Sequence, residues 1–380
     1  MSFSYISQQL ENQRDNHLLR QRQLVEEQAG RELVANGKRY LNFSSNDYLG
    51  LNNHPKINRA MQEGVDLFGT SSCSSSLVTG YNYAHQALEE TICTWLNKPK
   101  CLLFNSGFSA NYGVLNALAN DQTQFWLDKL SHASLIDGAL SGKAKVQRFL
   151  HNDYAQLDKK LTLKQLTNNL IVSEGVFSMD GDQADIVQLH NIAKKHQAWL
   201  YVDDAHSIGM IGKEGQGSTS YDDNIDIVMA TFGKAIATSG AFIACDDNLH
   251  EYLVNFARHY IYSTAISPAI SWATKTSIEI IQKEHWRREK IIQLSHLFSS
   301  TLNKNISLIP TTSSIHGIVL GSEQKALEIA QHLKNQGIWL TAIRPPTVAK
   351  NSSRLRVTIC ASHNDSDIMY LAECLNKVIN

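Results

Sequence analysis

The sequence predicts an α/β fold in which a large domain is built on a mostly parallel, seven-stranded sheet. Seven short apolar runs of strand length follow one another between residues 101 and 245: CLLF, FWLD, VQRFL, LIVSE, WLYVDD, IDIVMAT and AFIAC. Helical patterns separate several of these runs. Strands that alternate with helices are typical of a parallel sheet whose faces are covered by helices.

Different patterns flank this region, so we expect an arm over residues 1–45, the large domain over 46–285 and a smaller α+β domain over 286–380. In the arm, apolar residues recur among Gln and Arg between residues 5 and 29, which predicts an exposed amphipathic helix. Asn36-Gly37, between two apolar-rich runs, is a strong hairpin signal. In the last part, the runs IHGIVL, IWLTAI and RLRVTIC are mixed with helical patterns.

Composition and charge exclude several function classes. Of the 380 residues, 43% are hydrophobic, and the formal net charge of -1 gives no field that would attract nucleic acid or an anionic membrane. The six cysteines form no C-x-x-C pair and no Cys/His zinc spacing, so we expect reduced thiols and no metal. The first residues lack the apolar core of a signal peptide, and no run approaches the roughly 18 apolar residues of a membrane span. We therefore expect a cytoplasmic protein.

Polar residues follow four of the predicted strands, in the stretches NSGFSAN, GVFSMDGD, DDAHS and FGK. Ligands of open parallel sheets bind at the carboxyl ends of the strands. The phosphate loop G-x-x-x-x-G-K-[ST] and the dinucleotide motif G-x-G-x-x-G are absent, and Asn111 stands where a hydrolase elbow needs glycine. What remains is a lysine, an Asp-x-x-His, a serine and a glycine turn. Pyridoxal 5′-phosphate needs this set: an amine for a Schiff base, a carboxylate for the ring nitrogen and a cradle for the phosphate.

The order of the motifs points to one family. SSNDYLGL, HQALEE, SHASL, HND, EGVFSMDGD, VDDAHSIGMIG, TFGKA, FARHYIYST and IRPPTV resemble, in sequence order, motifs of the α-oxoamine synthases, which are pyridoxal-phosphate enzymes of fold type I. The resemblance implies the PLP-dependent transferase fold and an acyltransferase that joins an amino acid to an acyl thioester and releases CO₂. IRPPTV and HND favour the biotin-pathway branch, with L-alanine and a pimeloyl thioester, on CoA or a carrier protein, as substrates.

The resemblance also implies a cofactor site in the large domain. Lys234 is implied as the Schiff-base lysine, Asp203 as the partner of the pyridine nitrogen and His132 as the residue stacked on the ring, and these three form the catalytic set. The other implied cofactor contacts are Gly107, Phe108, Ser178, His206, Thr231, Ser263 and Thr264. The last two are expected to reach the phosphate across the interface of a homodimer. Asp204, next to Asp203, is expected to face away from the ring because strand side chains alternate.

Four further residues are implied at the substrate. Arg344, held in an extended chain by Pro345, is implied as a fork for the amino acid carboxylate, with Asn46 and Thr347 beside it. Arg20 matches a position for the acyl substrate, although its place in the predicted exposed helix equally suits a surface residue. Where relatives have a glycine-rich loop, this chain reads TSSCSSS at residues 70–76, which restricts the backbone.

Three alternatives stay open at this stage. A sibling α-oxoamine synthase would use glycine or another amino acid with a different acyl-CoA. A non-catalytic phosphate-binding protein of the same fold would have lost the lysine or the aspartate, and both are present. A metal enzyme built on Asp203 and His206 would need a second ligand cluster, which the sequence does not offer.

Overall fold

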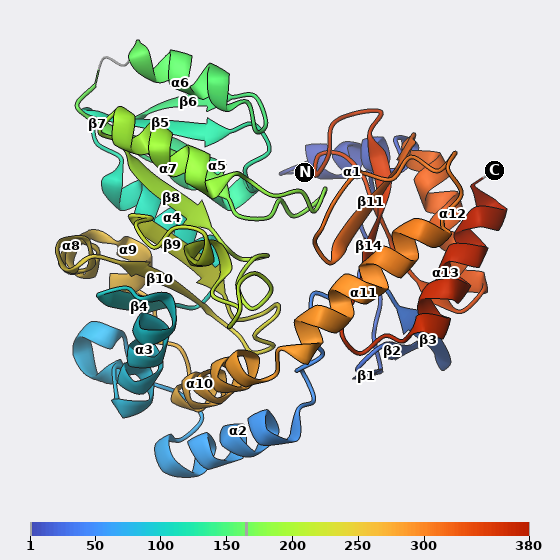
Figure 1. Cartoon of the computed structure of the whole chain (residues 1–380), viewed down its shortest axis with the longest axis horizontal. Coiled ribbons are helices and arrows are strands. Elements are labelled where there is room, and N and C mark those ends of the chain that lie inside the picture. The colour runs from blue at the N-terminus through green and yellow to red at the C-terminus, as the bar shows by residue number, and fades with distance from the viewer. Residues whose placement is uncertain (1, 164–165, 380) are drawn as a thin grey trace. The chain divides into compact units, whose positions relative to one another are not determined.

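The computed structural model describes residues 2–163 and 166–379, and these form two units (Figure 1). Unit 1 comprises Met1–Gly50, Met179–Asp182 and Arg287–Asn380, and unit 2 comprises Leu51–Ser178 and Gln183–Trp286. The first 45 residues, which the sequence analysis set apart as an arm, therefore lie in unit 1. The reason is a strand pairing: β3 (Lys38–Asn42) runs parallel to β12 (Ile338–Trp339).

Unit 2 is built on a seven-stranded sheet. Its strands are β4 (Lys100–Phe104), β5 (Thr123–Asp128), β6 (Lys145–Phe149), β7 (Asn168–Glu174), β8 (Trp199–Asp203), β9 (Ile227–Thr231) and β10 (Ala241–Cys245). They lie in the order β4-β10-β9-β8-β7-β5-β6, and β10 alone runs in the direction opposite to the other six strands. All seven apolar runs of the sequence form these strands, which confirms the mostly parallel sheet.

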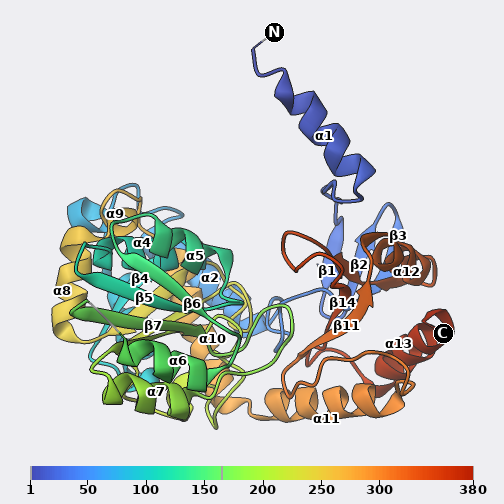
Figure 2. The ribbon, with the colours of Figure 1, turned by 90° about the horizontal axis from the view of Figure 1, so that it is seen from above.

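Helices cover both faces of this sheet. They are α2 (Pro55–Phe68), α3 (Tyr83–Leu96), α4 (Gly107–Leu118), α5 (Ala133–Leu140), α6 (Tyr154–Thr162), α7 (Ile186–Lys195), α8 (Asp247–Phe256), α9 (Arg258–Ile261) and α10 (Pro268–Lys283). Figure 2 shows α4 and α5 on one face and α6 and α7 on the other. The core under α4 and α5 includes Phe125, Val114 and Leu135, all fully buried.

Unit 1 contains two small sheets. One has the order β1 (Glu27–Ala29), β2 (Glu32–Ala35), β3, β12, and the other the order β11 (Ile315–Gly321), β14 (Ser353–Thr358), β13 (Thr341–Ile343). Its helices are α1 (Tyr5–Asp15), α11 (Trp286–Thr301), α12 (Glu323–Asn335) and α13 (Asp365–Val378). The expected hairpin is present: Ala35 pairs with Lys38, and Asn36 and Gly37 have φ angles of 52° and 66°, as its tight turn requires.

The amphipathic helix predicted for residues 5–29 is shorter than expected, because α1 ends at Asp15. His17 adopts a left-handed φ of 56°, and the backbone N–H of Leu18 donates to the carbonyl of Gln13 at 2.8 Å, a pattern that ends a helix. None of the α1 side chains is buried, and Figure 2 shows α1 projecting away from β1 and β2. Most of the stability of a helix in a protein comes from packing against other elements, and α1 lacks such packing in the described part of the chain, so nothing there stabilises a longer helix. Arg20 therefore lies outside any helix.

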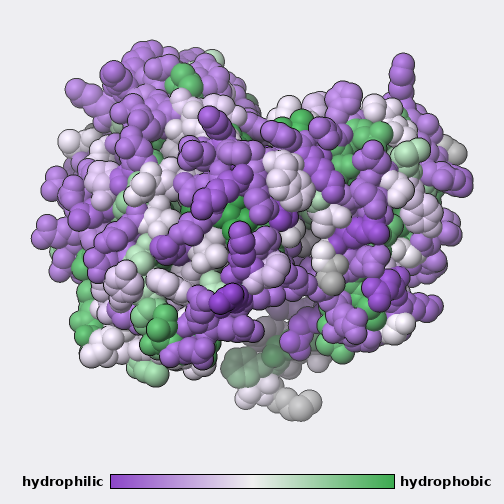
Figure 3. All heavy atoms as spheres, turned by 60° about the horizontal axis from the view of Figure 1, so that its bottom comes forward, coloured by the Kyte–Doolittle hydropathy of each residue, from purple (hydrophilic) through white to green (hydrophobic). Residues whose placement is uncertain are grey.

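The described surface is mainly polar. Figure 3 shows hydrophilic side chains over most of one face, with hydrophobic residues in small groups between them. None of the helices in residues 2–163 and 166–379 has the length and hydropathy that a bilayer span requires.

Candidate active site

The first turn of α4 meets the end of β9 in a close approach suited to an anion. A Cβ on Gly107 would lie 2.5 Å from Cγ2 of Thr231, so a larger residue at position 107 would crowd the Thr231 side chain. The hydroxyl of Thr231 is buried and has no hydrogen-bond partner in the structure. A buried polar atom without a partner is costly, and helix starts carry N–H groups free to bind an anion. These residues fit a phosphate group.

Asp203 is the last residue of β8, and its buried carboxyl group accepts hydrogen bonds. Its Oδ2 accepts from the side-chain amide of Asn111 at 2.8 Å, and its Oδ1 accepts from the backbone N–H of Ala205 at 3.0 Å. Asn111 lies on α4 and is 1% exposed. The neighbouring Asp204 has a different partner: its Oδ2 accepts from the backbone N–H of Ser218 at 2.7 Å.

Lys234 is held in a tight turn after β9. The N–H of Phe232 donates to Gly240 at 2.9 Å, and the N–H of Ala237 donates to the carbonyl of Lys234 at 3.0 Å. Phe232 and Ala235 on either side are fully buried, so the lysine stem has a fixed direction. Its Nζ lies 2.8 Å from Nε2 of the buried His206. The structure thus brings together the predicted lysine and the predicted Asp-x-x-His histidine.

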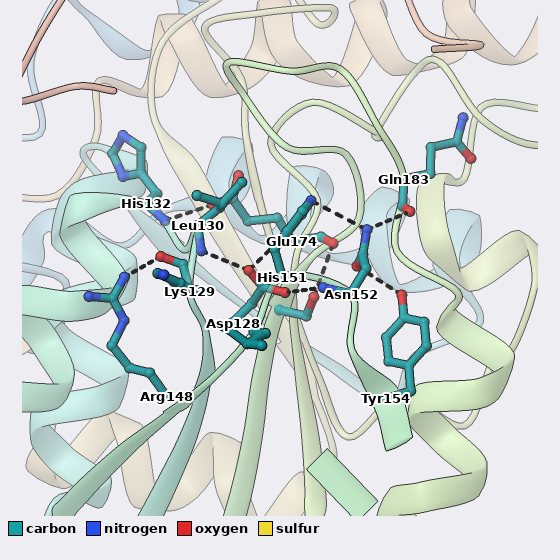
Figure 4. Close-up of polar contacts among 12 residues, drawn as sticks. Asp128, Lys129, Leu130, His132, Arg148, His151, Asn152, Tyr154, Glu174 and Gln183 are labelled. Atoms are coloured by element: carbon teal, nitrogen blue, oxygen red, sulfur yellow. Dashed lines mark hydrogen bonds and ion pairs between the residues drawn. The ribbon is translucent and has the colours of Figure 1, made fainter. Parts of the chain in front are cut away.

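His132 caps the start of α5, and both its backbone and its ring make hydrogen bonds; Figure 4 shows the backbone contact. Its backbone N–H donates to Oε1 of Glu174 at 2.7 Å. Its Nδ1 lies 2.8 Å from the hydroxyl of Ser134. Burial lowers the pKa of His132, and the carboxylate of Asp203 partly opposes this shift. Burial, followed by the charge of Asp203, raises the pKa of Glu174 well above its ordinary value.

The HND motif has a structural task beside this site. Asp128 at the end of β5 is fully buried and accepts from the ring of His151 and the N–H of Asn152, both at 3.0 Å (Figure 4). Asn152 accepts from the hydroxyl of Tyr154 at 2.9 Å and donates to the carbonyl of Gln183 at 3.3 Å. The motif therefore ties β5 and β6 to the segment after β7, where the half-buried Ser178 also lies.

Three predicted cofactor contacts lie nearer the surface of unit 2. Phe108 is 46% exposed on the first turn of α4. The carbonyl of Thr264, which follows Ser263, accepts from Asn105 at 2.9 Å, and Thr264 pairs with Ser75 of the serine-rich segment. That segment follows a tight path, since Cys73 has a left-handed φ of 55°. A contact of Ser263 and Thr264 across a subunit interface remains a prediction.

In unit 1, the predicted substrate residues fall into two groups. Asn46 belongs to the first group, where both terminal nitrogens of Arg356 lie 3.2 Å from its Oδ1. Arg356 is 8% exposed and also donates to Thr358 at 3.2 Å. The sequence analysis did not predict a role for Arg356. The sequence did contain an indication of one, because a cationic residue occupies a core-facing position of the run RLRVTIC.

The second group gathers at the turn after β13. The N–H of Thr347 donates to the carbonyl of Arg344 at 3.1 Å, and Arg20 donates to the hydroxyl of Thr347 at 3.1 Å. The Arg344 guanidinium donates to the carbonyl of His17. Burial, followed by the charge of Arg20, lowers the pKa of Arg344. A single carboxylate site shared by Arg344, Thr347 and Asn46 remains a prediction.

A metal site is a poor match to this arrangement. Among the residues that the structure describes, no three or more His, Cys, Asp or Glu side chains are grouped to hold a metal ion. Nε2 of His206 already lies 2.8 Å from the amine of Lys234.

The chain is similar to known enzymes over nearly its whole length. The family model for aminotransferase class I and II matches residues 38–375. The chain is 44% identical to the 8-amino-7-oxononanoate synthase of Salmonella enteritidis, over 94% of both chains. It is 43% identical to that of Photobacterium profundum, over 99% of this chain and 97% of the relative.

Solved structures of known enzymes have the same fold as this chain. A lysine-to-alanine variant of serine palmitoyltransferase from S. paucimobilis, with a bound PLP–myriocin aldimine, superposes with a TM-score of 0.93 at 28% identity, over 99% of this chain and 97% of that one. The 8-amino-7-oxononanoate synthase from Francisella tularensis has a TM-score of 0.78 at 28% identity, over 90% and 98%. The chain therefore belongs to the aminotransferase class I and II family and, within it, to the α-oxoamine synthases, which are PLP-dependent acyltransferases.

Proposed function

We propose that the protein condenses L-alanine with a pimeloyl thioester, with loss of CO₂, to give 8-amino-7-oxononanoate for biotin biosynthesis. The observation that carries this proposal is the 44% identity to an 8-amino-7-oxononanoate synthase over 94% of the chain. The pairing of Lys234 with His206, close to the ends of two parallel strands, supports it with a site able to perform the chemistry.

The residues of unit 2 fit pyridoxal 5′-phosphate. When bound, the cofactor supplies a ring that accepts electrons and so stabilises negative charge at the α-carbon of an amino acid. Thr231 and the helix start at Gly107 would hold its phosphate, and Asp203 would face its ring nitrogen. The predicted contacts of Phe108 and Ser178, and of His132 with the ring face, belong to the same proposal.

Lys234 has two tasks in this proposal. Its amine binds the cofactor, and it then takes the proton from the α-carbon of L-alanine and returns a proton to the product. His206 Nε2, at 2.8 Å, orients the amine by accepting its hydrogen bond. The buried Phe232 and Ala235 anchor the turn that carries the lysine.

The amino acid carboxylate needs a cation, and unit 1 offers two candidates. Arg344 is the residue implied by the sequence, next to Thr347 in one turn. Arg356 is a second candidate because it is buried and its guanidinium is fixed by Asn46. Arg20, bonded to Thr347, is proposed for the acyl substrate.

We also propose a homodimer whose partner contributes Ser263 and Thr264 to the phosphate. Large apolar side chains stand exposed close to these residues, with Tyr262 at 72% and Val78 at 74%. Apolar surface of this kind is typical of an interface. Sedimentation of the purified protein at several concentrations tests the assembly, and a monomer at all of them would contradict it.

An assay of amino acid and acyl specificity tests the function. The purified protein, with added pyridoxal phosphate, is incubated with pimeloyl-CoA or pimeloyl carrier protein and with L-alanine, glycine or L-serine. We expect release of thiol and CO₂, and 8-amino-7-oxononanoate by mass spectrometry, with L-alanine only. Turnover of glycine with acetyl-CoA, or of L-serine with palmitoyl-CoA, would assign a sibling reaction instead. Cofactor binding without turnover would favour a binding protein.

A further inference from the structure

A chain of buried hydrogen bonds links Tyr201 to His132 next to the proposed cofactor site, and no role has been assigned to its middle residues so far. The hydroxyl of Tyr201 lies 2.6 Å from Oδ1 of Asn111, and Nδ2 of Asn111 lies 2.8 Å from both Asp203 and the hydroxyl of Ser134. Ser134 in turn lies 2.8 Å from Nδ1 of His132. The three residues Asn111, Ser134 and Tyr201 are 1% exposed or less, so water does not compete for these bonds.

The direction of each bond in this chain follows from its chemistry. Burial, followed by the charge of Asp203, raises the pKa of Tyr201 well above its ordinary value, so the phenol keeps its proton and donates to Asn111. The opposite orientation of the amide would set its oxygen against the carboxylate of Asp203, two acceptors at 2.8 Å. The amide nitrogen therefore faces Asp203, and its two protons go to Asp203 and Ser134.

This direction reaches the ring of His132. Because the Ser134 hydroxyl accepts from Asn111, its own proton is available for Nδ1 of His132. The backbone N–H of Ser134 also donates to this Nδ1, at 3.2 Å. Both donors require a lone pair on Nδ1, so the proton of a neutral imidazole must be on Nε2.

We propose that Asn111 is a positioning residue that determines where protons lie in the cofactor site. Its one amide holds the carboxylate of Asp203 as an acceptor and, through Ser134, holds His132 as the tautomer with hydrogen on Nε2. The lowered pKa of His132, caused first by burial, agrees with a neutral ring there. The groups that face this ring are Asp203, Lys234 and Asp137, with Glu174 at its backbone. The proposal rests on the assignment of Asp203 and His132 to the cofactor.

The decisive variant is Asn111→Asp, which keeps the size of the side chain and the acceptor for Tyr201 but removes the amide protons. Two buried carboxyl groups this close cannot both be ionised, so the pair formed with Asp203 holds one proton, which reduces the charge at the ring nitrogen and leaves no donor for Ser134. Tyr201→Phe and Ser134→Ala break the chain at its two ends with smaller changes. Asn169→Asp is the matched control: Asn169 is also a buried asparagine of unit 2, but its Oδ1 accepts from Trp126 at 3.0 Å, away from this chain.

Two measurements on the full-length protein test the proposal. ¹⁵N NMR of histidine-labelled protein, with and without pyridoxal phosphate, should show His132 with Nδ1 unprotonated in the wild type. The fraction of the ring with a proton on Nδ1 should rise in Asn111→Asp and Ser134→Ala, where only the backbone N–H of residue 134 still favours the unprotonated Nδ1. Titration of apoprotein with pyridoxal phosphate should give a dissociation constant about 10- to 100-fold higher in Asn111→Asp, since one bond to a charged group is lost. Asn169→Asp should bind the cofactor as the wild type does.

A proton on Nδ1 of His132 in the wild type would overturn the proposal, as would Asn111→Asp with unchanged cofactor affinity and an unchanged His132 signal. If Asn111→Asp does not fold, Ser134→Ala and Tyr201→Phe decide by the same readouts. A wild type that binds pyridoxal phosphate but does not condense L-alanine would contradict the proposed function while leaving this test intact.

Discussion

The two units differ in how they position their predicted functional residues. In unit 2, Asp203 and Thr231 end parallel strands, and Lys234 follows one of them after a short turn. Parallel strands place their carboxyl ends at one edge of the sheet, so sequence order predicts which side chains lie near that edge. In unit 1, Arg20 and Arg344 lie on segments outside helices and strands. Their partners depend on the local path of the backbone, which sequence order does not specify.

The largest effect that tests this comparison is expected at Asp203. Asp203→Asn removes the charge proposed to face the ring nitrogen, and kcat/KM should fall by about 1000-fold, the upper end for losing one electrostatic contact in a site. Steady-state assays with L-alanine measure this loss. Asp204→Asn is the adjacent control: the Asp204 carboxyl group is bonded to the backbone N–H and the hydroxyl of Ser218 and has no proposed contact with the ring, so this change should cost little activity. Equal losses in the two variants would contradict the assignment.

The sequence predicted the sheet of unit 2 well because each strand is a continuous apolar run. It also predicted the separation of Asp203 from Asp204, since strand side chains alternate. It did not predict Asn111, although this amide interrupts the apolar stripe of Ala110, Val114 and Leu115 on α4. A buried amide in such a stripe indicates a partner, but the partner, Asp203, is 92 residues away. Helix α1 ends early because it packs against no other described element, and a local sequence pattern cannot predict that such contacts are lacking.

The next largest effect is an acid-induced loss of stability in unit 1, linked to His316. His316 on β11 is 2% exposed, neither ring nitrogen has a hydrogen bond, and burial lowers its pKa to about 4. Because the folded pKa lies below the unfolded value of about 6.5, the stability linked to this group is complete above pH 6.5 and is lost as the pH falls toward 4. The loss should be on the order of 3 kcal/mol.

Hydrogen exchange of unit 1 peptides between pH 7 and pH 4.5 measures this effect. His316→Leu should reduce the acid-induced exchange, whereas His332→Gln on the exposed face of α12 should not. Acid sensitivity that is the same in His316→Leu and the wild type would show that another group is responsible.

A smaller effect concerns the two arginines of unit 1. Arg344→Lys and Arg356→Lys should each raise the KM for L-alanine about tenfold, because lysine cannot make the two parallel bonds of a guanidinium to a carboxylate. If both contact the same carboxylate, the double variant should fall short of the product of the two effects. A rise in KM in one variant only would assign the carboxylate to that arginine and reject a shared site.

The smallest effects are expected at two turns that have no role in the site. Gly37 has a φ of 66° and open space around it, so Gly37→Ala should lower the free energy of unfolding by about 1 kcal/mol through backbone strain alone. Gly69 in unit 2 combines a φ of 81° with a ψ of -177°, a region nearly restricted to glycine, so Gly69→Ala should cost more, about 2 kcal/mol. Denaturant unfolding gives both values. A change in the KM for L-alanine in either variant would contradict the claim that these two turns have no role in the site.

The most direct test of the central claim is the absorbance spectrum of the purified protein with added pyridoxal phosphate, compared with that of Lys234→Ala. We predict a band at the edge of the visible range in the wild type that changes on addition of L-alanine and is missing from Lys234→Ala. A wild type without this band, or a Lys234→Ala variant that retains it, would contradict the role of Lys234.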